Sequence, residues 1–349
     1  QKLVSLCYKK LNMSKKNSNV LNLKDSIKLD KIILKTYSLF KKNIVRYKNK
    51  KLVAAISGGP DSLALAGMLK ILEYEKKIQV YYVLVDHSIR KTSQNEAKKV
   101  KILLKKYKIS LKILKNKKKI DRNIQSAARE IRYELLSDFC KKNNANYILT
   151  AHHRDDQVET FLIRLSRGSG VQGLSGMDLS SSLSKKIKII RPLLDCKKEN
   201  LIYISKKLFG KYFNDPSNKN QKYLRTKIRN LKTILEKSGL SYDQILKSIK
   251  NLSSTRDTLN RYVTKLYKNN VSAKNKKILI KYDSISKETK EIQLKLFSKI
   301  LKNYTRSYYP PRSKKILNLI DKLKQGKIKN LNLSGCTIKK VGRIIEIKK

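Results

Sequence analysis

Two short segments of this chain carry residues whose types and spacing suit chemistry. The first segment, SGGPDS at 57–62, follows the apolar run 52–56 and precedes a helix-like stretch. Gly58 and Gly59 have no Cβ, so the backbone of this turn can approach phosphate oxygens closely. The free N–H groups and the positive dipole end of the next helix would point into the same turn. The segment therefore predicts a site for the phosphates of a nucleotide.

The other residues of this segment refine that prediction. The hydroxyls of Ser57 and Ser62 add hydrogen-bond donors, and Pro60 fits the first turn of a helix. No lysine lies inside the segment, so it is not the GxxxxGK[ST] loop. Asp61 places a carboxylate where phosphates would gather, which suits a Mg²⁺ ion or the amine of a substrate. An ordinary helix N-terminus with a glycine turn is the alternative interpretation.

The second segment is TAHHRDDQVET at 150–160, which contains two of the three histidines of the chain. If the residues from Arg154 onward are helical, Asp156 and Glu159 lie at i and i+3 on one face. Such a pair of carboxylates suits a cationic ligand, for example the ammonium group of an amino acid. The alternatives are an acidic first turn that complements the helix dipole, or a zinc site, whose usual H-E-x-x-H spacing is absent here.

The elements that must position these segments alternate between strand-like and helix-like residues as far as about 190. Apolar runs of strand length lie at 52–56, 80–85, 111–114 and 147–149, and helix-period segments separate them. This pattern predicts an α/β fold with a doubly wound, mostly parallel sheet. Because such sheets bind ligands at the C-terminal ends of their strands, both segments fall where a ligand is expected.

The residues beyond about 197 show a mainly helical pattern. We expect helices within 200–209, 223–237 and 242–267, and a polar linker at 268–277. Helix-like and short strand-like runs follow, which predicts a small α+β module at the C-terminal end.

The composition limits the classes of protein to which this chain can belong. The 349 residues include 83 Lys and Arg against 26 Asp and Glu, a formal charge of +57, which favours a polyanionic partner. The four cysteines show no CxxC spacing, so we expect a reducing, cytoplasmic location. No apolar stretch approaches the roughly 20 residues that span a bilayer, so no membrane association is expected.

Two arginine pairs could contact anions. Arg129 and Arg132 lie one turn apart on a predicted helix, and Arg129, beside small alanines, could reach a triphosphate in a bidentate manner. Arg225 and Arg229 lie at i and i+4 on another predicted helix, a spacing that suits contact with RNA phosphates. Solvated basic faces explain both spacings equally well.

Taken together and in order, these motifs resemble the tRNA(Ile)-lysidine synthases of the PP-loop ATP pyrophosphatase superfamily. The motifs are SGGPDS, VDHSIR, NIQSAAREIRYELL, TAHHRDDQVET joined to FLIRLSRGSGVQGLSGM, DPSN and YLRTKIRN, with GCTIKKVGRIIEI near the end. The resemblance implies an adenine nucleotide alpha hydrolase-like fold. It also implies four parts: an N-terminal extension and lead-in helix at 1–45, a PP-loop catalytic domain at 46–230, a helical region at 231–270 and a tRNA-binding module at 271–349.

The activity that the resemblance implies is ATP-dependent ligation of free L-lysine to C2 of cytidine 34 in a CAU-anticodon tRNA(Ile). An adenylated cytidine would be the intermediate, AMP and pyrophosphate would be released, and the tRNA would then read AUA and accept isoleucine instead of methionine. ATP and Mg²⁺ are the implied cofactors. A homodimer is left open.

The resemblance also assigns roles to individual residues. It assigns ATP binding to Ser57, Gly58, Gly59, Pro60, Asp61 and Ser62, catalysis to Asp61, Arg129 and His152, lysine binding to Asp156 and Glu159, and tRNA binding to Arg167, Arg225 and Arg229. Asp61 is also the implied Mg²⁺ ligand. One departure is that Leu231, Lys232 and Thr233 follow the IRN run, where the family often has a proline.

Two other functions compete with this one. A PP-loop tRNA thiolation enzyme would share the fold and the adenylation, but such enzymes generally need paired or catalytic cysteines near the site. A non-catalytic RNA-binding protein would explain the charge but would leave SGGPDS and the acidic segment without a role.

Overall fold

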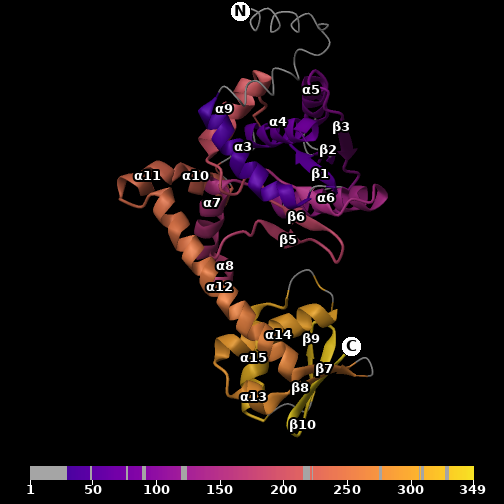
Figure 1. Cartoon of the computed structure of the whole chain (residues 1–349). Coiled ribbons are helices and arrows are strands. Elements are labelled where there is room, and N and C mark those ends of the chain that lie inside the picture. Colours follow the sequence, from indigo (N-terminus) through magenta and orange to yellow (C-terminus); the bar gives the residue numbers. More distant parts are fainter. Residues whose placement is uncertain are drawn as a thin grey trace, which may run out of the picture. The chain divides into compact units, whose positions relative to one another are not determined.

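The computed structural model describes residues 30–47, 49–75, 78–88, 92–118, 124–214, 221, 223–274, 277–305, 307, 310–326 and 330–349. Most of the predicted N-terminal extension, residues 89 and 90 of VDHSIR and the DPSN run at 215–218 lie outside these residues. Two compact units are present (Figure 1): one holds Gln1–Ser169 and Gly176–Ser248, the other Gly170–Ser175 and Ile249–Lys349. The division into four parts stays a prediction.

A six-stranded sheet forms the centre of the first unit, with strand order β3-β2-β1-β4-β6-β5. All neighbouring pairs are parallel except β5 with β6. The strands are β1 (Lys51–Ile56), β2 (Gln79–Asp86), β3 (Leu111–Lys115), β4 (Tyr147–Leu149), β5 (Ser180–Ser182) and β6 (Lys188–Ile190). The predicted mostly parallel α/β sheet is confirmed, and β5 and β6 are additions that the apolar runs did not reveal.

Helices cover both faces of this sheet because its strands are apolar on both sides. Along β1, Leu52, Ala54 and Ile56 pack into one core, while Val53 packs into the core on the opposite face. The first core is covered by α3 (Lys31–Ile44), α4 (Pro60–Glu75), α5 (Ser93–Lys105) and α9 (Lys198–Phe209), the second by α6 (Ile124–Lys142). The sheet is therefore doubly wound, as predicted.

The strand order places a switch in direction between β1 and β4. The chain runs outward from β1 through β2 to β3, and then crosses to the other side of β1 to form β4. In the register of this pair Ala54 lies opposite Leu149, so both strands end at the same edge of the sheet. Ligands of such sheets bind at this kind of crevice. The segments after β1 and β4 are thus brought together.

Gly58 has a conformation that other residues rarely adopt. Its φ is +85°, and a Cβ built on it would lie 2.5 Å from Cγ2 of Val100 in α5. The next residue, Gly59, has no such constraint, since the nearest atom to its Cβ would be 3.7 Å away. The tight turn therefore needs glycine at position 58 only.

This difference predicts unequal effects of two matched substitutions. Gly58→Ala should lower the melting temperature by roughly 5 °C or more, because a left-handed conformation alone costs an L-residue about 1–2 kcal/mol and the contact with Val100 adds to it. Gly59→Ala should stay within about 2 °C of the wild type. Thermal unfolding followed by circular dichroism measures both, and equal losses would contradict the assignment.

The second unit has its own core between a sheet and helices. Its antiparallel sheet has the order β7-β8-β11-β10-β9, and α13 (Tyr282–Ser286), α14 (Lys290–Thr305) and α15 (Ser313–Lys324) contribute to the same core. The strands are β7 (Val271–Lys274), β8 (Lys277–Lys281), β9 (Leu331–Leu333), β10 (Cys336–Val341) and β11 (Ile344–Lys348). A small α+β module is confirmed.

The predicted polar linker at 268–277 is wrong. Helix α12 (Tyr242–Asn270) extends into it, and β7 then pairs antiparallel with β8. Val271 lies opposite Ile280 in that pairing, and the other residues of β7, Ser272, Ala273 and Lys274, are exposed at a sheet edge. The polar composition of the run therefore gave no indication of a strand.

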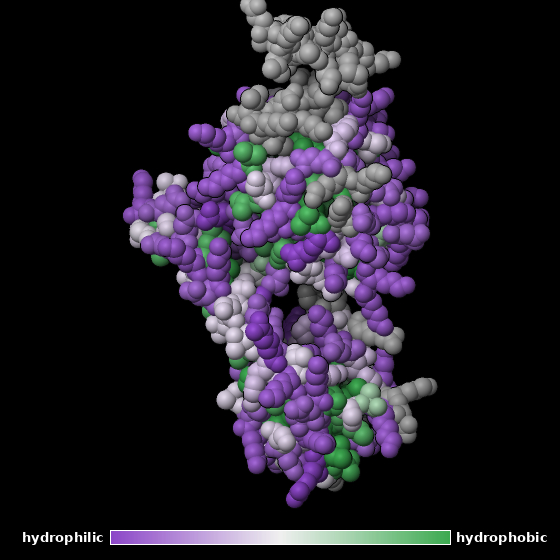
Figure 2. Space-filling model, viewed as in Figure 1, coloured by the Kyte–Doolittle hydropathy of each residue, from purple (hydrophilic) through white to green (hydrophobic). Residues whose placement is uncertain are grey.

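The visible surface is dominated by hydrophilic side chains, and apolar side chains form small separate groups (Figure 2). None of the helices in the described part of the chain combines the length and apolar character needed to cross a bilayer.

Candidate active site

The SGGPDS turn is held in shape by its own last serine. Ser62 Oγ accepts hydrogen bonds from the backbone N–H groups of Ser57 and Gly58, each at 3.1 Å, and donates to the carbonyl of Gly59 at 3.0 Å. The N–H of Phe213 donates to the carbonyl of Gly58 at 3.0 Å. Pro60 is the first residue of α4, as predicted. The turn is therefore built before any ligand arrives.

Asp61 lies in the first turn of α4 and faces the acidic segment. Its Oδ2 is 3.6 Å from Nε2 of His153, while its Oδ1 is buried and has no hydrogen-bond partner among the described residues. An unsatisfied buried carboxylate oxygen is costly unless a ligand completes it. A Mg²⁺ ion or an ammonium group fits this oxygen.

The described residues contain no group of three or more His, Cys, Asp or Glu side chains able to hold a metal. Mg²⁺ is often bound through one or two carboxylates together with substrate phosphates. Asp61 therefore fits a Mg²⁺ ion that is shared with a nucleotide, and a zinc site gains no support from the described side chains.

Helix α7 (Arg154–Leu165) begins at the residue where the sequence predicted a helix, after the short connection 150–153 that follows β4. His153 is its N-cap, and Oδ2 of Asp156 accepts the backbone N–H of His153 at 3.0 Å. Asp156 and Glu159 therefore share one face of this helix, as expected from their spacing. Burial acts to raise the pKa of Asp156, but the charges of His153 and His152 and the backbone hydrogen bond hold it below its usual value.

Glu159 is enclosed by two arginines of α10 (Leu224–Asn230). Its side chain is 1 % exposed, and Nε and Nη2 of Arg229 donate to its two oxygens at 2.6 and 3.1 Å. Nε of Arg225 lies 3.3 Å from the same carboxylate. Burial raises the pKa of Glu159, and the hydrogen bonds and charge of Arg229 oppose that rise. Arg225 and Arg229, which we expected to bind tRNA, therefore contact Glu159, which we expected to bind lysine.

His152 has different contacts from its neighbour His153. Its Nδ1 lies 2.8 Å from Oγ1 of Thr150. Burial, together with the nearby cations Arg191, Arg129 and Arg225, lowers the pKa of His152 to about 3, although Asp156 opposes this. His152 is therefore neutral at physiological pH and is surrounded by cationic groups suited to an anion.

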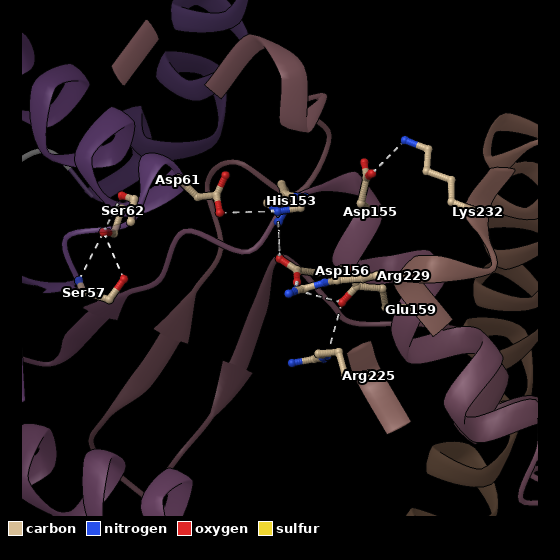
Figure 3. A network of polar contacts seen from close by, with 11 residues as sticks. Ser57, Asp61, Ser62, His153, Asp155, Asp156, Glu159, Arg225, Arg229 and Lys232 are labelled. Carbon is tan, nitrogen blue, oxygen red and sulfur yellow. Dashed lines mark hydrogen bonds and ion pairs between the residues drawn. The ribbon is translucent and has the colours of Figure 1, made fainter. Parts of the chain in front are cut away.

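His153 lies between two carboxylates (Figure 3). Its Nε2 is 3.5 Å from Oδ2 of Asp156, in addition to the contact with Asp61, and the side chain is 2 % exposed. Burial acts to lower the pKa of His153, but the contact that Nε2 makes with the accepting carboxylate of Asp61, together with the charges of Asp156 and Asp61, raises it above its usual value.

These opposite shifts predict that the two neighbouring histidines titrate differently. In NMR spectra of histidine-labelled protein, the His152 ring should show no titration between pH 8 and pH 5, whereas His153 should titrate above pH 6.5. By linkage, the contribution of His152 to folding stability is lost as the pH drops below 6.5. The contribution of His153 is lost as the pH rises through the pKa that His153 has in the folded protein. Identical titration of both rings near pH 6.5 would contradict these environments.

Lys232 is a site residue that the sequence did not indicate. In α11 (Lys232–Lys237), its Nζ lies 3.1 Å from Oδ2 of Asp155, 3.4 Å from Oε1 of Glu199 and 4.8 Å from the centre of the Tyr242 ring. It neutralises Asp155, which leaves Asp156 as the neighbouring carboxylate that faces His153 and Asp61. Only its place two residues beyond the IRN run could have drawn attention to it.

Two assigned residues lie apart from this network. Arg129 is exposed on α6, with its guanidinium 5.0 Å from the centre of the Tyr133 ring, and it acts on His152 through its charge. Arg167 is exposed beyond the C-terminal end of α7, at the opposite end of that helix from Asp156. A further cation that the sequence did not indicate is Arg191, which follows β6, is 6 % exposed and donates to the carbonyl of Asp178 at 2.8 Å.

Comparison with known proteins identifies relatives of this chain. The PP-loop domain family matches residues 29–235. A protein of Wolbachia pipientis wMel named tRNA(Ile)-lysidine synthase is 34% identical over 311 residues, which cover 87% of this chain and 72% of that protein. The protein of the same name from the Wolbachia of Brugia malayi is 32% identical over 304 residues, with 86% and 70% coverage.

A solved structure shows the same fold. The U34-tRNA thiolase NcsA from Methanococcus maripaludis superposes with a TM-score of 0.55 at 20% identity, covering 64% of this chain and 79% of that chain. At this identity the likeness concerns the fold alone.

Proposed function

The chain belongs to the tRNA(Ile)-lysidine synthase family and carries its PP-loop domain, and on this premise we propose that it ligates free lysine to C2 of cytidine 34 in the CAU-anticodon tRNA(Ile). It is an enzyme that modifies tRNA. The observation that carries the proposal is that the SGGPDS turn and the acidic first turn of α7 meet at one sheet edge, with Asp61 and Asp156 both beside His153.

The reaction needs two steps because the O2 of cytidine is a poor leaving group. In the first step O2 attacks the α-phosphate of ATP, and the bond to the pyrophosphate breaks. In the second step the ε-amine of lysine attacks C2 and AMP leaves with the former O2. The ε-ammonium, with a reference pKa of about 10.4, must lose a proton first. A carboxylate of the site would accept it.

We assign the nucleotide to the SGGPDS turn. Gly58 and Gly59 let the backbone approach phosphate oxygens, and the N-terminus of α4 adds its positive dipole end. His152 and Arg129 would stabilise the negative charge that develops on the α-phosphate. Mg²⁺, when bound, would neutralise phosphate charge, and Asp61 is the residue that would hold it.

We assign the ammonium group of the lysine substrate to Asp156 and Glu159. Glu159 already binds cationic nitrogens in the structure, since Arg229 and Arg225 contact it. Because these arginines neutralise Glu159 as Lys232 neutralises Asp155, the ammonium group would have to take the place of one guanidinium group to reach Glu159. Arg225, Arg229 and Arg167 remain our candidates for tRNA phosphates.

The test is incubation of the protein with ATP, labelled lysine and a tRNA(Ile) transcript bearing CAU. We expect label in the tRNA together with AMP and pyrophosphate, and no label when ATP is left out. Adenylation without lysine incorporation, with sulfur transferred from a persulfide donor instead, would refute the proposal.

The described cysteines give little support to the alternative function, tRNA thiolation. Cys140 and Cys196 are buried, and burial raises the pKa of each thiol to about 12, so neither is a thiolate at neutral pH. We expect Cys140→Ala and Cys196→Ala to keep the wild-type rate of lysine transfer, as measured in the same assay. Loss of transfer in a variant that remains folded would revive the alternative.

A further inference from the structure

His153 joins two carboxylates that come from different parts of the chain. Asp61 belongs to the first turn of α4, and Asp156 to the first turn of α7. Nε2 of His153 lies 3.6 Å from the first and 3.5 Å from the second (Figure 3). The ring is therefore a physical link between the nucleotide turn and the acidic pocket.

Helix stability alone does not account for a histidine at this position. His153 is the N-cap of α7, where Asn, Asp, Ser and Thr are the residues that stabilise a helix best. Its Nδ1 is buried and has no hydrogen-bond partner among the described residues. A buried polar atom without a partner lowers the stability of the fold. The contacts of Nε2 must compensate for this cost.

The two contacts of Nε2 compete with each other. Both distances are longer than the 2.7–3.2 Å of an ordinary N–H···O hydrogen bond, and a single Nε2–H cannot donate fully to two carboxylates. Oδ1 of Asp61 has no hydrogen-bond partner among the described residues, so a ligand at the SGGPDS turn can draw this carboxylate toward itself. The imidazole N–H is then left to Asp156 and holds that carboxylate in one orientation.

We propose that His153 is a positioning residue that couples the two ligand sites: a nucleotide at the SGGPDS turn fixes Asp156 through His153 and thereby strengthens the binding of lysine. The coupling rests on the proposed function. By linkage, lysine strengthens the binding of the nucleotide by the same factor.

The experiment measures lysine binding to the full chain by titration calorimetry, with and without an ATP analogue whose α,β-bridge is a methylene group. In the wild type we expect the analogue to tighten lysine binding at least fivefold, the lower end of typical coupling. His153→Asn keeps a good N-cap but removes the imidazole, and should reduce the factor to less than about twofold. His153→Gln, whose amide N–H can reach toward the carboxylates, should restore part of it.

Controls separate this role from a structural one. His87→Asn removes the remaining histidine, which lies at the end of β2 beside Arg132, and should keep the wild-type factor. A melting temperature close to that of the wild type must accompany the loss in His153→Asn. Wild-type coupling in a folded His153→Asn variant, or absence of coupling in the wild type, would overturn the inference. Either result in a protein that still transfers lysine to tRNA leaves the proposed function intact.

Discussion

Asp156→Asn should raise the KM for lysine roughly 100-fold, because a hydrogen bond to a charged group contributes up to about 3 kcal/mol. The asparagine keeps an oxygen that can accept the N–H of His153, so α7 should still begin at the same residue. Only the charge that attracts the ammonium group is removed. Steady-state kinetics with lysine as the varied substrate, at saturating ATP and tRNA, measure the change.

The matched control is the neighbouring Asp155. Both residues are 9 % exposed, but Asp155 is paired with Lys232 and is not assigned to the substrate. Asp155→Asn should leave the KM for lysine within about threefold of the wild type. Equal increases in the two variants would mean that only the net charge matters, and an unchanged KM in Asp156→Asn would remove this residue from the lysine pocket.

Asp61→Asn should lower kcat for pyrophosphate release roughly 100- to 1,000-fold, the effect typical of losing one stabiliser of developing charge, because asparagine would hold the Mg²⁺ ion more weakly. Oδ1 of Asp61 is the buried carboxylate oxygen without a hydrogen-bond partner among the described residues of the site, and asparagine fills the same space without the negative charge. Release of pyrophosphate from labelled ATP in the presence of tRNA measures this step directly.

The control for Asp61 removes the same charge from another helix N-terminus. Asp30 caps α3, where its Oδ1 accepts the N–H groups of Ile32 and Ile33, and asparagine serves equally well as an N-cap. Asp30→Asn should keep the wild-type kcat. A wild-type rate in Asp61→Asn would show that this carboxylate takes no part in the adenylation.

The sequence predicted the elements of the fold that carry a strong apolar pattern. The runs at 52–56 and 147–149 became β1 and β4, because these strands are buried on both faces and need apolar residues throughout. β5 consists of three serines at a sheet edge, and β7 is mostly exposed, so neither has an apolar signature. Such strands are defined by their pairing partners.

The candidate site likewise contains one part that the sequence predicted and another that it could not predict. Helical periodicity was enough to place Asp156 and Glu159 on one face, because the two residues belong to one helix. The position of His153 between Asp61 and Asp156 depends on the strand order of the sheet, which no local pattern encodes. For the same reason, the i,i+4 spacing of Arg225 and Arg229 could not reveal that Glu159 lies opposite them.

Mass spectrometry of nucleosides from the reacted tRNA is the most direct test of the central claim. After incubation with ATP and lysine, position 34 of the CAU transcript should carry cytidine joined through C2 to the ε-nitrogen of lysine. A transcript with uridine at position 34 should stay unmodified. Unchanged cytidine at position 34, or lysine attached at another nucleotide, would contradict the account.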